Sequence, residues 1–150
     1  MTTQNFDFTN ATNAILSFWL NYNTEVNHDG TRMEYSIDNG TNWNVLGSYN
    51  DPNGVNWYDI ASISSSSLPA WAGNSSGWKK AEYNLSAFNG LPGVKFRFIF
   101  TSNSSGFYEG ISIDDFEINI PNPIDAGVTN IIQPIAVLNQ GVLSPVEVII

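Results

Sequence analysis

Two adjacent aspartates, Asp114 and Asp115, interrupt an apolar segment whose alternating pattern is typical of a β-strand. Successive strand residues point to opposite faces, so we expect one carboxylate to face the core, where it needs hydrogen bonds, a counter-charge or a metal ion. Calcium is the natural ion, because it prefers hard oxygen ligands and the chain has no cysteine. Three acidic residues beside predicted strand ends could help to bind it, so the expected calcium site consists of Asp114, Asp29, Glu25, Glu109 and Asp115. The alternative is a carboxylate satisfied by backbone amides at a β-bulge.

Three aromatic residues could bind a ligand by stacking. Trp57, Tyr58 and Trp71 lie in a long polar segment, residues 48–77, that lacks strand periodicity and includes a run of serines. Flat aromatic faces beside amides and hydroxyls are typical of sugar-binding surfaces. The same residues could instead pack the loop onto the core, and for Trp57 and Trp71 the sequence leaves both interpretations open. Trp78, directly before a predicted strand, is expected to pack in this way.

The residue types exclude several classes of enzyme. The single histidine, His28, excludes sites built on two imidazoles, and the lack of cysteine excludes thiol catalysis and disulfides. His28 lies in a turn, and no Gly-x-Ser-x-Gly motif supplies a nucleophile for a Ser-His-Asp triad. Nothing in the sequence positions a pair of catalytic carboxylates. We therefore predict that the protein is not an enzyme.

Composition and charge narrow the range of partners. The 150 residues are 42% hydrophobic, enough for one core, but only 13% charged, with a net charge of −9. Five cations are too few to neutralise a nucleic-acid backbone or to bind an anionic membrane surface. No apolar run is long enough to insert into a membrane, and the first residues are too polar for a signal peptide. If the protein is exported, we expect this to be a mature piece of a longer chain.

The elements that must position these residues are strands. Apolar residues alternate with polar ones, as in Val94, Phe96, Phe98 and Phe100, and no segment keeps a helical period. The segment 15–22 is almost continuously apolar and predicts a central strand covered on both faces. The other predicted strands are residues 31–37, 43–46, 94–100 and 110–120. The pattern predicts an all-β fold, an antiparallel β-sandwich.

Residues 36–43 (SIDNGTNW) match the S-x-D-x-G-x-x-W pattern of an Asp-box. This pattern predicts a hairpin in which the Asp38 carboxylate accepts hydrogen bonds from the backbone amides of the turn. In this hairpin Gly40 takes a positive φ and Trp43 folds back under the turn. The pattern is strong for structure and says almost nothing about function, because the same hairpin occurs in enzymes and in inert modules.

Two prolines mark a boundary near the end of the chain. Pro121 and Pro123 end the last long strand, so we predict a module over residues 1–120 and a linker over residues 121–124. Residues 125–150 contain two apolar β-like runs but are too few for a core. We interpret them as the truncated start of a second β domain, whose unpaired strands could pair within the chain or with a neighbour. Residues 125–128 (DAGV), with Gln133 and Pro134, resemble the start of an Ig-like domain.

Several segments together resemble a known module: residues 16–22 (LSFWLNY), 34–43 (EYSIDNGTNW), 77–86 (GWKKAEYNLS), 94–98 (VKFRF) and 109–115 (EGISIDD). The combination is similar to the MAM-like or cleaved-adhesin jelly-roll of large secreted bacterial proteins, including peptidases and substrates of the type IX route. The resemblance implies a non-catalytic extracellular or cell-surface module with structural calcium (Ca2+), in which Asp114 is a ligand. Two departures are a missing strand before Asn5 and the presence of Ser102 and Asn103 where relatives carry Ser-Asp.

Two functions follow as expectations. The first is a calcium-stabilised adhesion or binding module of a larger secreted protein, which binds a glycan or a protein surface. The second is an architectural spacer, or an accessory domain packed against neighbouring domains such as a parent peptidase, with no ligand of its own. Exposure of Trp57 and Trp71 in one groove would favour the first.

Overall fold

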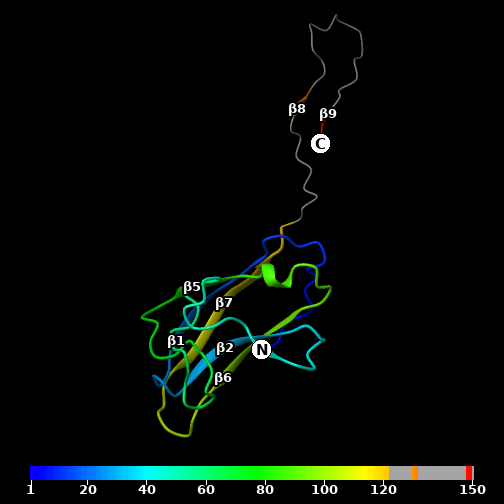
Figure 1. Cartoon of the computed structure of the whole chain (residues 1–150). Helices are drawn as coiled ribbons and strands as arrows, with labels where there is room; N and C mark the ends of the chain where they lie inside the picture. The colour runs from blue at the N-terminus through cyan, green and yellow to red at the C-terminus, as the bar shows by residue number, and fades with distance from the viewer. Residues whose placement is uncertain (122–129, 132–147, 150) are drawn as a thin grey trace, which may run out of the picture.

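The computed structural model describes residues 1–121, 130–131 and 148–149 (Figure 1). Two short strands, β8 (Asn130–Ile131) and β9 (Val148–Ile149), pair in antiparallel orientation. The rest of the predicted linker and of the predicted Ig-like start, residues 122–129, 132–147 and 150, lies outside the described residues. The division of the chain into these parts therefore stays a prediction.

Seven strands form two antiparallel sheets that pack face to face, which confirms the predicted all-β sandwich (Figure 1). The first sheet has the order β4 (Gly54–Val55), β5 (Lys79–Asn84), β1 (Ile15–Asn23) and β7 (Gly110–Asn119). The second has the order β3 (Asn44–Val45), β2 (Gly30–Ser36) and β6 (Lys95–Thr101). A short 3-10 helix, Ser86–Phe88, lies between β5 and β6 in the chain. All five strands predicted from periodicity are present, each within a few residues of its expected bounds.

The core lies between the sheets and is built on β1. Phe18 points inward and meets the rings of Trp71 and Phe98 edge-on, with centroids 5.4 and 5.0 Å apart. The opposite face of β1 leaves Ile15 and Trp19 exposed. The prediction that this strand is covered on both faces is therefore wrong, because an apolar run shows total hydrophobicity and cannot show that one of its faces remains uncovered.

An ion-pair network ties the second sheet together. The Glu34 carboxylate is buried, yet it accepts Arg32 Nε at 2.7 Å on one oxygen and Arg97 Nε at 2.8 Å on the other. Arg97 stands opposite Glu34 in the register of β2 and β6, so the sheet itself sets this contact. Arg97 also lies over the indole of Trp43, 4.1 Å from the ring centroid. Glu34 is thus buried on the outer face of the second sheet, beneath the two arginines, with both carboxylate oxygens engaged.

The Asp-box forms the predicted hairpin. The Asp38 carboxylate accepts the backbone amide of Asn42 at 2.9 Å and the hydroxyl of Ser36 at 2.7 Å. Gly40 takes a φ of 95°, and its carbonyl accepts the indole N–H of Trp43 at 2.9 Å. The hydrogen bonds, first that from the Asn42 amide, lower the pKa of Asp38 from 3.8 to about 2.

This pKa predicts how the hairpin responds to acid. Between these two pKa values the unfolded chain protonates Asp38 while the folded chain keeps it ionised. The stabilisation is therefore complete above the unfolded pKa of 3.8 and is lost as pH falls towards about 2. In urea melts at stepped pH, Asp38→Asn is expected to be less stable than the wild type at neutral pH and to lose less stability in this window. If the free energy of unfolding changed with pH in the same way in the two proteins, the lowered pKa assigned to Asp38 would be contradicted.

Candidate functional site

A β-bulge places both aspartates of β7 on the surface. Ser17 of β1 pairs with Glu117 of β7, and Trp19 pairs with Asp114. Two residues of β7 therefore lie opposite the single residue Phe18 of β1. Asp115 takes a φ of 48°, and its amide donates to Asp114 Oδ1 at 2.9 Å. Both side chains are exposed. The prediction that one of them faces the core is wrong, because the extra residue shifts the alternation of the strand.

Two exposed tryptophans stand beside these carboxylates. Trp19 is 39% exposed in the middle of β1, and Trp78 is 49% exposed directly before β5. Together with Asp114 and Asp115 they line an open cavity of about 310 Å³ on the outer face of the first sheet, which we call the tryptophan pocket. The expectation that Trp78 packs the loop onto the core is also wrong. Its position before β5 gave no sign of which face of the sheet it would join.

The face around the tryptophan pocket is acidic. Lys80 stands opposite Trp19 in the register of β1 and β5 and forms an ion pair with Glu82 at 2.8 Å. The hydrogen bond from Lys80 to Glu82 raises the pKa of Lys80 above its ordinary value, and the negative charges of Glu82 and Glu117 raise it further. The cation nearest Trp19 in the register is therefore already engaged by a carboxylate of the same strand.

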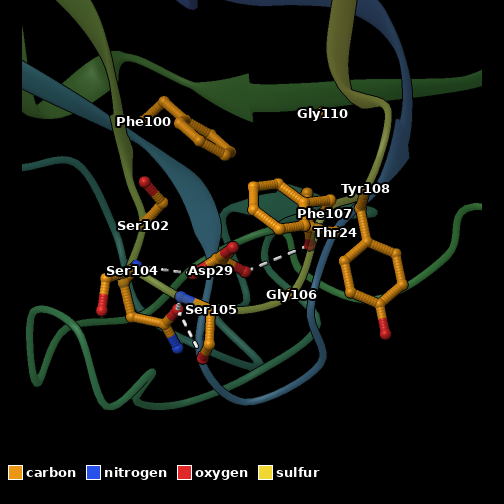
Figure 2. Close-up of a pocket in the computed structure, with 11 residues that line it drawn as sticks. Thr24, Asp29, Phe100, Ser102, Ser104, Ser105, Gly106, Phe107, Tyr108 and Gly110 are labelled. Atoms are coloured by element: carbon orange, nitrogen blue, oxygen red, sulfur yellow. Dashed lines mark hydrogen bonds between the residues drawn. The ribbon is translucent and has the colours of Figure 1, made fainter.

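The other acidic residues of the expected calcium site lie at the far end of β1 and β7. Asp29 is buried and its Oδ1 accepts the Asn103 amide at 2.9 Å, while Glu25 Oε2 accepts Asn103 Nδ2 at 3.1 Å. Figure 2 shows Asp29 in a cavity of about 340 Å³, which we call the loop pocket; the residues that line it are Thr24, Asp29, Phe100, Ser102, Asn103, Ser104, Ser105, Gly106, Phe107, Tyr108 and Gly110. Glu109, directly before β7, is exposed between two residues that line this pocket.

The fold separates the five predicted ligands into two groups. Gly110 pairs with Asn23 near the loop pocket, whereas Asp114 pairs with Trp19 four residues away along β1. At the usual rise of a strand this is a separation of about 13 Å, too far for one ion. Among the described residues no three His, Asp or Glu side chains lie close enough together to hold a metal ion.

The aromatic residues of segment 48–77 pack into the core. Trp57 and Tyr58 are 4% exposed and Trp71 is fully buried. The indole N–H of Trp57 donates to the Leu46 carbonyl and that of Trp71 to the Asn56 carbonyl, both at 2.9 Å. The prediction of a ligand-binding face at these residues is wrong, because each polar group in the cluster finds a backbone partner and so can be buried at little cost.

The turn that carries His28 contacts the serine run of the same segment. His28 Nδ1 lies 2.7 Å from Ser64 Oγ, and the Ser64 amide donates to the Asn27 carbonyl at 2.8 Å. Both side chains are exposed in turns. The contact attaches the long segment to the turn between β1 and β2.

A family model for Reelin subrepeat B matches residues 1–119, which include all seven strands of the sandwich. The chain belongs to the Reelin subrepeat B family. Reelin subrepeats are non-catalytic, β-rich extracellular modules, which confirms the coarser part of the predicted resemblance. A comparison with curated proteins gave no match. The MAM-like assignment, the type IX route and a bacterial origin stay predictions.

In this Reelin subrepeat B module, the helical part of the described chain is one 3-10 turn, and no helix there has the length and hydrophobicity to cross a membrane. The alternation of apolar residues indicated the β-sandwich, and the resemblance to a jelly-roll module implied that it is extracellular. The tryptophan pocket was missed. Its signal was the outward register of Trp19, which depends on the pairing of β1 with β5 and β7.

Proposed function

We propose that this module is an extracellular binding domain that binds a glycan in the tryptophan pocket. The observation that carries the proposal is the presence of two exposed tryptophans, Trp19 and Trp78, in one cavity with two carboxylates. Large aromatic side chains usually lie in the core, so a pair of them left in water on one face suggests a contact surface.

The chemistry of the pocket suits a sugar. Indole faces stack on the C–H faces of a pyranose ring, and carboxylates accept hydrogen bonds from its hydroxyls. Trp19 stands on a central strand paired on both sides, so its backbone is held rigidly and little entropy is lost on binding. Each pocket is small, so we expect weak binding per site that gains strength by repetition along a surface.

The test is calorimetric titration with chitotetraose and cellotetraose as neutral probes. Trp19→Ala and Trp78→Ala are each expected to weaken binding by about tenfold, the effect of losing one stacking contact. Their melting temperatures should stay close to that of the wild type, since both side chains lie outside the core.

Phe107→Ala is the matched control. Phe107 is a fully exposed aromatic residue at the loop pocket, away from the outer face of the first sheet. Its loss should leave binding unchanged. Binding that survives both tryptophan variants, or that depends on Phe107, would contradict the proposed site. Failure of the wild-type protein to bind the sugars would favour the spacer function.

We also propose that calcium stabilises the module at the loop pocket, with Glu25 and Asp29 as ligands. The residues fit a hard cation, because the buried Asp29 carboxylate and the half-buried Glu25 carboxylate converge on Asn103 and serines line the pocket. Bound calcium would supply charge neutralisation at this end of the sandwich. Asp114 and Asp115 are not part of this proposal.

Calcium removal is expected to lower the melting temperature. At a hundredfold excess over Kd, binding contributes about 2.7 kcal/mol, which corresponds to a fall of several degrees when EDTA is added. Asp29→Asn should abolish the response to EDTA, and Asp114→Asn should preserve it. Wild-type samples that melt at the same temperature with EDTA and with calcium would contradict this second proposal.

A further inference from the structure

We infer that the tryptophan pocket selects sugars that carry a protonated amine, such as oligosaccharides of glucosamine, over neutral and anionic sugars. The inference rests on the proposed glycan-binding function and adds the chemical class of the ligand. It follows from the charges that surround the two indoles.

The first step concerns the two aspartates. Asp114 Oδ1 accepts one backbone amide, from Asp115, and both side chains are exposed at the cavity. Among the described residues, four of the five lysines and arginines form ion pairs with other carboxylates, and the fifth, Lys95, donates to the Asn39 carbonyl at 3.4 Å. The pocket therefore presents two negative charges that no basic side chain in the described part of the chain neutralises.

The second step concerns the rest of the face. Glu82 on β5 and Glu117 on β7 both pair with Ser17, which lies two residues before Trp19 on β1. Lys80 forms an ion pair with Glu82. A uronic acid or a sulfated sugar would be repelled by this face. A neutral sugar would replace water with hydrogen bonds from its hydroxyls but would leave the negative charge of the aspartates uncompensated. A protonated amine compensates that charge and forms charge-assisted hydrogen bonds.

The third step concerns the indoles. The face of a tryptophan ring attracts a cation, so the same two side chains that stack on a sugar ring favour an ammonium group beside it. The molecule uses this contact twice elsewhere: Arg97 lies 4.1 Å from the centroid of Trp43, and Lys79 Nζ lies 4.9 Å from that of Tyr22. In the tryptophan pocket the cation would have to come from the ligand.

The test compares the tetramer of glucosamine with chitotetraose, its N-acetylated counterpart, by calorimetry at mildly acidic pH, where the amines of the ligand are protonated. The wild-type protein is expected to bind the amine form about tenfold more tightly at low salt, with the preference shrinking at high salt. Asp114→Asn/Asp115→Asn should bind the two sugars within about twofold of each other. Asp7→Asn, a charge loss at an exposed position that does not line the tryptophan pocket, should keep the preference.

The outcomes separate the two proposals. Equal binding of the two tetramers by the wild type, with loss of both in Trp19→Ala, would overturn the amine preference and leave the glycan site intact. A preference that persists in the double asparagine variant would also overturn the inference, since the charge would then come from elsewhere. If the wild type binds neither tetramer, both the inference and the proposed function fail.

Discussion

Replacing Trp71 with alanine is expected to destabilise the module by about 4 kcal/mol, the range for a buried tryptophan whose cavity cannot close. Trp71 is fully buried and lies edge-on to Phe18 and Trp57, with centroids 5.4 and 4.9 Å away. Its loss also leaves the Asn56 carbonyl without its indole donor. Urea unfolding followed by circular dichroism would measure the shift in midpoint.

Trp78→Ala is the matched control, because the same side chain is removed from an exposed position. We expect its effect to be below about 1 kcal/mol, as for most surface substitutions. Similar destabilisation by the two variants would show that segment 48–77 is not packed as described. A Trp71→Ala protein that stays stable but binds no sugar would show that the ligand site lies in segment 48–77.

Replacing Glu34 with glutamine is expected to cost about 3 kcal/mol, because it leaves two arginines without the buried carboxylate that both contact. Glutamine keeps the size of the side chain, so the loss reports charge rather than packing. The measurement is again the free energy of unfolding in urea, with comparison of the slopes to exclude a change of the folded state.

The control for Glu34 is Glu82→Gln. Glu82 forms an ion pair with Lys80 at 2.8 Å, the same kind of pair, but both side chains are well exposed. Exposed pairs contribute little, so we expect a loss below about 1 kcal/mol. Equal losses at Glu34 and Glu82 would contradict the idea that burial makes the network of Arg32 and Arg97 important.

Local patterns in the sequence predicted the strands and the hairpin correctly. The alternation in β6 and the Asp-box around Asp38 depend on residues close in sequence, so their structure can be inferred without knowledge of the partners. The same holds for the exclusion of cysteine and multi-histidine chemistry, which needs only the residue types.

The candidate site could not be predicted in this way, because it depends on register. Asp114 and Asp115 share a face only because the pairing of β7 with β1 shifts by a residue, and Trp19 is exposed only because the outer side of β1 is uncovered. The prediction for Trp57 and Trp71 was wrong in the opposite sense, since they were expected at the surface and are buried. A serine-rich neighbourhood suggested the surface, but backbone carbonyls of Leu46 and Asn56 allow both indoles to be buried.

The central claim is that the tryptophan pocket is the binding surface, and an NMR titration of the indole N–H signals tests it directly. The chain has five tryptophans, so each signal can be assigned by single substitution. On addition of the glucosamine tetramer we expect the signals of Trp19 and Trp78 to shift, while those of the buried Trp57 and Trp71 stay in place. Shifts confined to Trp43, or to the buried pair, or no shift of any indole, would contradict the account.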